Sequence, residues 1–243
     1  TQNVSNLWSN FYRGIRAAST FIEAVDLCQD CDPAIISQYK AEARVLRAYY
    51  YYNLMRSFGP VILLGETPIP ADADLDALGL KRNSIDEVAA YITSELDIAA
   101  AALDGVSFTG NNAGRMSTPF AMAIKEQTLL FAASPLFNGN TDYADFIGQD
   151  GENLIPQNYD VNKWKAAADA AKAFIDKYVP NTYSLYEEFN EDGSYNPYLS
   201  TRNVMLEDFN SEIIYARPAG VNYFHYDVTP YHLGSATEVR GAG

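Results

Sequence analysis

The stretch RAYYYYNLMRSFGP, residues 47–60, places four consecutive tyrosines shortly before a Gly-Pro pair. A helix turns by about 100° per residue, so residues 49–52 span most of its circumference and cannot share one face. A helix that is apolar on all sides is either surrounded by protein or spans a membrane. A span needs about 20 apolar residues, and this run is far shorter and bracketed by Arg44, Arg47 and Arg56. We therefore expect a central helix in a soluble helical domain.

The composition is that of a folded domain with a strong acidic bias. Of the 243 residues, 48% are hydrophobic and 13% are aromatic, so disorder is not expected. The 17 basic and 31 acidic residues leave a net charge of −14. A charge of this sign and size repels phosphate backbones and anionic lipid surfaces. We therefore expect no nucleic acid among the partners of this protein.

Five segments carry helix signals. Asp32 followed by a proline starts the tyrosine helix, and Ser84 with Glu87 forms a capping box for the next one. Thr118 is the expected cap of a fourth helix, which also opens with a proline. The expected helices cover about residues 5–27, 33–58, 85–103, 119–134 and 162–178. In the tyrosine helix, the line expected to be most buried is Tyr39, Ala43, Leu46, Tyr50 and Leu54.

Small residues recur where neighbouring helices must approach closely, as in Ala17 and Ala18 and again in Ala132 and Ala133. This indicates helix pairs that stack in the manner of tetratricopeptide repeats, although no strict repeat is visible. The predicted fold class is therefore mainly α, a superhelix of tetratricopeptide-like helix pairs with long loops and minor β structure. After residue 180 the chain becomes rich in loop residues, with one expected strand at residues 211–217.

The only cysteines, Cys28 and Cys31, form a Cys-x-x-Cys pair. A redox motif would need a βαβ context, and a zinc site would need a second ligand pair nearby. The only histidines, His225 and His232, lie far away in the sequence. The spacing favours two plain thiols or, in an exported protein, a small local disulfide over a metal site.

Asp72, Asp74 and Asp76 match positions 1, 3 and 5 of a calcium-binding loop. The match fails further on, because Ala77 stands where the loop needs Gly and Asn83 stands where it needs Glu. This pattern favours a solvated acidic loop. We expect no cofactor, and calcium has no motif to support it.

The sequence contains no nucleophile elbow, no phosphate-binding Gly-rich loop and no His-Glu-x-x-His motif. Two histidines also leave few general bases. Glycoside hydrolysis needs a carboxylate pair, but a chain with 31 acidic residues always offers such pairs, so their presence is uninformative. We expect a protein that is not an enzyme.

The segment GVNYFHYDVTPYHLG, residues 220–234, is crowded with aromatic residues and has no helical period. Tyrosine suits neutral polar ligands because it offers an apolar face and a hydroxyl at low entropic cost. Such a loop is either a set of buried anchors or a ligand platform, and composition does not decide between them. The candidate ligand-binding residues are Tyr223, Phe224, Tyr226, Tyr231 and His232, with Asn3 and Asn6 expected before the first helix.

Four segments closely resemble the SusD/RagB family of surface glycan-binding lipoproteins and occur in the family's order. They are EARVLRAYYYYNLMRSFGPVILL (42–64), GRMSTPFAMAIKEQTLLFAASPLFNG (114–139), WKAAADAAKAFI (164–175) and SEIIYAR (211–217). The opening LWSNFYRGIRAASTFIEAV also fits the family's first scaffold helix. The resemblance implies a helical scaffold over residues 1–217, followed by an aromatic loop region, residues 218–243, at the start of a missing C-terminal portion.

The same resemblance implies that the protein binds oligosaccharides at the cell surface and delivers them to a SusC-like TonB-dependent transporter of the outer membrane. Full-length family members begin with a lipoprotein signal and an anchoring cysteine, so the lipid anchor is expected outside this chain, which looks truncated at both ends. The family's motif residues then have structural roles, with Glu42 as a partner for the arginines. In this chain the motif residues are Glu42, Arg44, Arg47, Gly114 and Arg115.

Two alternatives stay open from the sequence. One is a tetratricopeptide-like scaffold that binds proteins or peptides without contacting sugar, which would place Tyr223, Tyr226 and Tyr231 in the core or against a protein partner. The other is a glycoside hydrolase fragment, which would place an acid pair beside a cleft. The sequence names neither the glycan nor its linkage and length.

Overall fold

The computed structural model of the chain describes residues 2–70, 72–74, 76–107 and 110–216. The α-helices of this part are α1 (Gln2–Ala24), α2 (Pro33–Phe58), α3 (Ile85–Ala102), α4 (Thr118–Ala133), α5 (Val161–Tyr178) and α6 (Pro197–Asn203). Short 3₁₀ turns occur at Val25–Leu27, Gly110–Asn112 and Thr141–Tyr143. Within the described ranges β structure is limited to two isolated bridges, Ile147 with Asn153 and Phe189 with Tyr195. The fold is mainly helical, as predicted.

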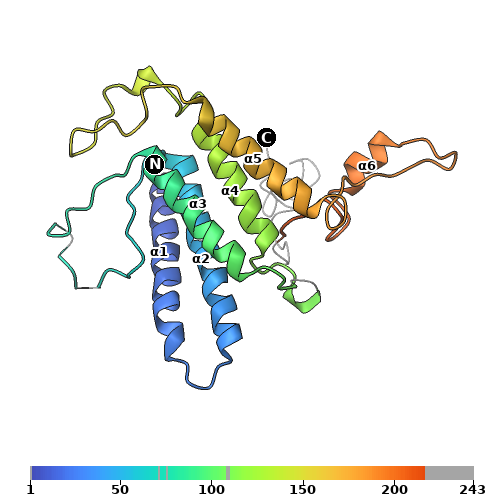
Figure 1. Cartoon of the computed structure of the whole chain (residues 1–243), viewed down its shortest axis with the longest axis horizontal. Coiled ribbons are helices and arrows are strands. Elements are labelled where there is room, and N and C mark those ends of the chain that lie inside the picture. Colours follow the sequence, from blue (N-terminus) through green and yellow to red (C-terminus); the bar gives the residue numbers. More distant parts are fainter. Residues whose placement is uncertain (1, 71, 75, 108–109, 217–243) are drawn as a thin grey trace, which may run out of the picture.

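The first five helices form an array in which each helix packs against the next along the chain. α1 and α2 run side by side and are joined by a short turn, and α4 and α5 lie side by side on the other flank (Figure 1). α2 also contacts α4. This succession of antiparallel neighbours is consistent with the predicted tetratricopeptide-like pairing. α6 and its loops project from the array near the C-terminal end of α5 (Figure 1).

The tyrosines of α2 contact helices on different sides, beginning with α1 and α3. The ring of Tyr50 packs so closely on α1 that a Cβ atom added to Gly14 would lie 2.6 Å from it. Tyr51 is fully buried and meets Tyr91 of α3 edge to face, with ring centroids 5.2 Å apart.

The other two tyrosines of the run at 49–52 reach α4. The ring of Tyr49 lies 5.4 Å from that of Phe120, and the Tyr52 hydroxyl donates to Gln127 Oε1 at 2.9 Å. α2 is thus contacted by α1, α3 and α4, which confirms the prediction of a central helix.

Helix starts follow the predicted caps with one exception. Asp32 and Ser84 cap α2 and α3 as predicted. The cap of α4 is Ser117, and the predicted cap Thr118 is instead the first helical residue. Its hydroxyl donates to the carbonyl of Ala100 in α3 at 3.2 Å. The side chain of Thr118 therefore connects α3 to α4 instead of capping the start of α4.

Some predictions of local structure are wrong. Residues 211–216 form turns and irregular backbone where a strand was predicted, because their hydrogen bonds go to local turns and to Ser184, not to a neighbouring strand. α6 lies in a region predicted to be loops, where Asn196 caps it. The predicted buried line of α2 is only partly right: Ala43 and Leu54 are buried, but Tyr39 is 38% exposed, whereas Val45, outside the line, is fully buried.

Cys28 and Cys31 form a disulfide in the turn between α1 and α2, so the local disulfide is the correct one of the two sequence-based interpretations. None of the described helices is long and apolar enough to cross a bilayer. The predicted boundary between residues 217 and 218 lies outside the described residues.

Candidate functional site

A cavity of about 820 Å³ lies where the C-terminal end of α5 faces the N-terminal end of α4. Its wall has three described parts. They are residues of 103–107 and 110–119, the end of α5 with residues 182–183, and residues 209–216. This volume falls within the range of about 300–1,000 Å³ that is usual for small-molecule sites. The cavity is therefore the candidate functional site.

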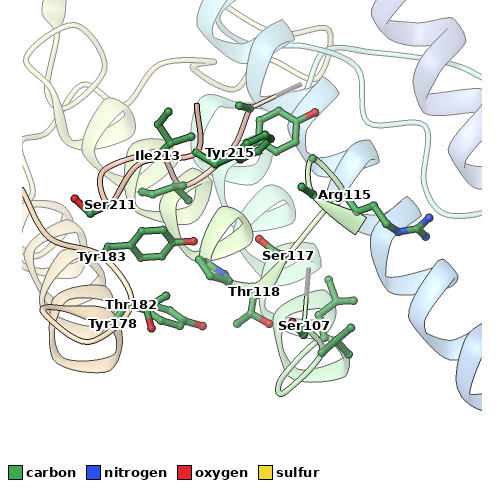
Figure 2. A pocket seen from close by; sticks show the side chains of 18 of the residues that line it. Ser107, Arg115, Ser117, Thr118, Tyr178, Thr182, Tyr183, Ser211, Ile213 and Tyr215 are labelled. Atoms are coloured by element: carbon green, nitrogen blue, oxygen red, sulfur yellow. The ribbon is translucent and has the colours of Figure 1, made fainter. Parts of the chain in front are cut away.

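An aromatic corner forms at the last turn of α5. Thr182 and Tyr183 both donate their backbone N–H groups to the carbonyl of Tyr178, at 2.8 and 3.0 Å. This tight turn brings the Tyr183 ring back over the helix, where it stacks on Phe174 at 5.9 Å and meets Tyr178 edge to face at 6.0 Å. Figure 2 shows both tyrosines in the cavity wall. Burial raises the pKa of both phenols, so they remain neutral hydrogen-bonding groups at physiological pH.

The segment 209–216 is fixed in place without regular secondary structure. Phe209 has a φ of 52°, which is rare for a bulky residue, and it turns the chain back toward the helices. The Ser184 N–H then donates to the carbonyl of Ser211 at 3.0 Å. Further on, the ring of Tyr215 lies 4.6 Å from that of Phe120 in α4. The segment is thus held both on the α5 side and on the α4 side of the cavity.

The charged groups at the wall are paired. Lys177 Nζ lies 2.6 Å from Asp104 Oδ1, and this hydrogen bond raises the pKa of Lys177. Arg115 pairs with Glu42 at 2.7 Å and lies over the Tyr39 ring at 4.8 Å. Its guanidinium consequently points away from the cavity (Figure 2). A ligand therefore meets no unpaired charge on the described part of the wall.

What the wall offers instead is aromatic surface and neutral hydrogen-bonding groups. The hydroxyls of Ser117 and Thr118 are engaged with the Phe120 N–H and the Ala100 carbonyl. Across the cavity, Tyr178 and Tyr183 supply rings with a hydroxyl at one end. A neutral molecule with apolar ring faces and many hydroxyl groups matches such a wall.

The chain is similar in sequence and in structure to known proteins. Residues 1–119 match a SusD-like family model described as "Starch-binding associating with outer membrane". A "SusD-like protein" of Bacteroides ovatus is 28% identical over 192 residues, which cover 74% of this chain and 34% of the relative. The solved structure of BT4246 is 26% identical with a TM-score of 0.69, over 81% of this chain and 32% of that chain. Over residues 1–119 the chain is thus similar to the SusD-like family.

A second solved structure, described as one "with xylogluco-oligosaccharide", is 22% identical with a TM-score of 0.50, over 73% of this chain and 30% of that chain. This likeness shows a shared fold. The chain described here spans about a third of the length of these relatives.

The sequence-predicted site residues fall in two places. Tyr223, Phe224, Tyr226, Tyr231 and His232 lie outside the described residues.

Asn3 and Asn6 lie within α1 and not before the first helix as predicted. Asn6 is exposed there and does not line the cavity. For Asn3 the error arose because the helix begins three residues earlier than its apolar period indicates, whereas Asn6 already lies within the predicted range of about residues 5–27.

Sequence reasoning missed the aromatic corner of the cavity. Tyr178 and Tyr183 lie far from Thr118 in the sequence. Only the packing of α4 against α5 brings the three residues to the wall of one cavity. A signal was nevertheless present. Both tyrosines flank the end of the predicted fifth helix, where aromatic residues enter a loop without period.

Another groove, of about 480 Å³, runs between α1 and residues 62–70. Its aromatic side chains are engaged by the protein itself. The Tyr12 hydroxyl donates to the Ile62 carbonyl at 2.9 Å and accepts from its N–H at 3.0 Å, and the guanidinium of Arg82 covers the Trp8 ring at 5.5 Å. In the larger cavity Lys177 likewise lies over the Tyr178 ring, at 5.4 Å. We place the candidate site there because that cavity has the greater volume and is also lined by Tyr183 and Tyr215.

The acidic loop is stabilised as a turn. Asp74 Oδ1 accepts the N–H groups of Asp76 and Ala77 at 3.1 and 3.4 Å, and Asp72 and Asp76 are exposed. In the described part of the chain, no group of three or more His, Cys, Asp or Glu residues is placed to hold a metal ion.

Proposed function

We propose that this SusD-like chain binds neutral oligosaccharides in the cavity between α4 and α5 without cleaving them. The observation that carries the proposal is a wall of tyrosine rings and hydroxyls in which the charges are paired. A sugar ring presents apolar C–H faces and peripheral hydroxyls, which match aromatic faces and neutral donors and acceptors. The family description, starch-binding, supports the same class of ligand.

The wall also bears on catalysis. Glycoside hydrolysis uses two carboxyl groups on either side of the bond. Asp104 is the one carboxylate among the described lining residues, and it is held by Lys177. This arrangement favours binding over the hydrolase alternative.

The proposal extends to the aromatic segment that follows the wall. Tyr215 lines the cavity, and Tyr223 lies eight residues further along, a distance of at most about 29 Å. Tyr223, Phe224, Tyr226, Tyr231 and His232 are therefore proposed to contact the same ligand. Asn3 and Asn6 are proposed only for a separate contact at the start of α1.

We further propose that the full-length protein lies at the surface of the outer membrane, held by a lipid anchor outside this chain. There it passes its ligand to a SusC-like TonB-dependent transporter. The words "associating with outer membrane" in the family description support this placement. Co-purification of the full-length protein with the transporter from outer membranes tests it, and separation of the two at all ligand concentrations would contradict it.

Calorimetric titration tests the binding proposal directly. The probes are maltoheptaose, a xyloglucan oligosaccharide and an acidic oligogalacturonide. We expect saturable heat with a neutral probe, no binding of the acidic one, and no release of reducing ends. Sustained heat flow would instead indicate catalysis, and silence with all probes would overturn the proposal. Addition of EDTA is expected to leave the affinity unchanged, since no cofactor is proposed.

Variants locate the site. Tyr183→Ala removes a ring from the wall and is expected to weaken binding about ten-fold, whereas Tyr183→Phe keeps the ring and loses less. Tyr159→Ala is the matched control, because Tyr159 is 65% exposed and precedes the opposite end of α5. The combined replacement of Tyr223, Tyr226 and Tyr231 by alanine tests the second segment. Unchanged affinity in that variant would remove these three residues from the site.

A further inference from the structure

Residues 184–208 form an arm that begins and ends at the cavity wall. Tyr183 precedes it and Phe209 follows it, and both line the cavity. The base of the arm is closed by the Ser184 N–H, which donates to the Ser211 carbonyl at 3.0 Å, and by the Tyr186 N–H, which donates to Glu212 Oε1 at 3.0 Å. The arm projects from the helical array (Figure 1).

Hydrogen bonds within the arm hold its shape. Glu188 is the centre, since its N–H donates to Ser200 Oγ at 2.8 Å and its carboxylate accepts from the Tyr186 hydroxyl at 2.7 Å and from Asn203 Nδ2 at 2.6 Å. The Asn196 N–H donates back to the Glu188 carbonyl at 2.8 Å. α6 is thereby fastened to the hairpin that precedes it.

The tip of the arm, residues 189–198, presents three exposed aromatic rings. Tyr198 is 71% exposed, Phe189 57% and Tyr195 49%. Phe189 and Tyr195 also face each other across the hairpin, with ring centroids 6.0 Å apart. The tip contains no Leu, Ile, Val or Met. The hydrogen-bonded frame thus holds three aromatic side chains at the surface of the tip, two of them in contact with each other.

We infer that the tip of the arm is a second contact for the same glycan, so that the protein prefers long oligosaccharides to short ones. The inference rests on the proposed function. The wall residue Tyr183 and the tip residue Phe189 are six residues apart, at most about 22 Å, so one extended chain can reach from the cavity to the tip. Tyrosine and phenylalanine rings provide stacking surface for sugar faces, and exposed carboxylates such as Glu191 provide acceptors for sugar hydroxyls.

A basic protein surface is the other class of partner that such an arm could attract. The arm carries six acidic residues, Glu187, Glu188, Glu191, Asp192, Glu207 and Asp208, and one basic residue, Arg202. The exposed aliphatic side chains that would suit a protein partner, Leu185, Met205 and Leu206, lie outside the tip. The purely aromatic composition of the tip therefore favours the glycan.

The test compares ligand lengths. The probes are maltotriose with maltoheptaose, and single-repeat with double-repeat xyloglucan oligosaccharides. The variant carries Tyr195→Ala and Tyr198→Ala together. We expect its affinity for the longer probe to fall about ten-fold, to the level of the shorter probe, while the shorter probe binds as in the unsubstituted protein. A variant with Tyr195→Phe and Tyr198→Phe keeps both rings and is expected to keep the length preference. Tyr159→Ala, away from the arm, is expected to change neither.

The outcomes separate the two proposals. If no probe of either length binds the unsubstituted protein, the proposed function and this inference both fail. If the alanine variant binds each probe as tightly as the unsubstituted protein does, the cavity remains a glycan site and the arm is excluded. If, in addition, an oligolysine peptide binds the unsubstituted protein but not the alanine variant, a basic protein surface replaces the glycan as partner. Circular dichroism of each variant excludes unfolding as the cause.

Discussion

Arg47 of α2 and Glu95 of α3 form an ion pair at the centre of the helical array, with Arg47 Nη2 2.5 Å from Glu95 Oε2 and side-chain exposures of 0% and 3%. Arg47 also donates to Ser19 Oγ of α1 at 3.0 Å and to the Glu66 carbonyl at 3.3 Å. The other carboxylate oxygen of Glu95 accepts from Arg44 at 2.6 Å. One carboxylate and one guanidinium thus connect α1, α2 and α3.

Replacing Glu95 by Gln should strongly destabilise the fold. Removing one member of a buried ion pair leaves the other charge without compensation, which costs about 3–5 kcal/mol. Urea unfolding followed by circular dichroism measures the loss. Asp97→Asn is the matched control, two residues away on the same helix. Asp97 pairs with Lys125 at 2.7 Å but is 58% exposed, so its replacement should cost less than about 1 kcal/mol. Equal losses in the two variants would contradict a special role for the buried pair.

This pair shows where sequence reasoning stops. The sequence predicts Glu42 as a partner for the arginines of the motif, and this is confirmed for Arg115 but not for Arg47. Glu42 and Arg47 are five residues apart and point in different directions on α2, so Glu42 does not reach Arg47. The true partner of Arg47 lies 48 residues away, on a helix whose neighbour is decided only by packing. Local signals cannot identify such a partner.

Helix positions were predictable because their signals are local in the sequence. The cap at Asp32, the capping box at Ser84 and the tyrosine run act through neighbours in the sequence, so they are readable without a structure. The cavity is assembled from three segments that meet only in the folded chain. Its third segment, residues 209–216, has no periodic pattern because turns hold it. This is why the fold was largely predicted and the described cavity was not.

Gly14→Ala should destabilise the packing of α1 on α2. Within a helix this change normally stabilises by about 1 kcal/mol. Here the new Cβ would lie 2.6 Å from the Tyr50 ring, and such overpacking costs about 1–3 kcal/mol. Thermal unfolding should therefore show a lower Tm. In a Tyr50→Ala background the ring is gone, so the same Gly14→Ala change should become neutral or stabilising. The same loss in both backgrounds would show that the contact is not the cause.

Glu87 should make stability depend on pH in the acidic range. Hydrogen bonds from the Ser84 backbone N–H and hydroxyl hold the pKa of Glu87 below its ordinary value of 4.5. The unfolded chain then binds more protons in this range, so the contribution is complete above about pH 5 and is lost as pH falls through the lowered pKa. Relative to Glu87→Gln, the unsubstituted protein should be more stable near neutrality, and the difference should shrink in acid. A constant difference from neutral pH to pH 3 would rule this out. In a Ser84→Ala background the pH-dependent part of the difference should be smaller.

Arg115 should act as a positioning residue for the cavity. Its ion pair with Glu42 and its contact with the Tyr39 ring tie residues 110–117 to α2, although its guanidinium points away from the cavity (Figure 2). Loss of this partly exposed pair should weaken local protection by about 1 kcal/mol, or about five-fold in exchange rate. Hydrogen exchange should therefore be faster in Arg115→Ala and Glu42→Gln at the N–H groups of residues 113 and 115, which close turns in this segment.

The control for this prediction is Lys165→Ala, which removes an exposed pair with Asp169 within α5 and ties no separate segments together. Arg115→Lys should restore little protection, because an ammonium keeps the charge but neither the bidentate geometry nor the planar contact with the Tyr39 ring. If the segment exchanges at the same rate in Arg115→Ala as in the control, the wall is held by its own turns. Glycan affinity should then also be unchanged in Arg115→Ala. If Arg115 is a positioning residue, the variant should show both faster exchange in this segment and weaker glycan binding.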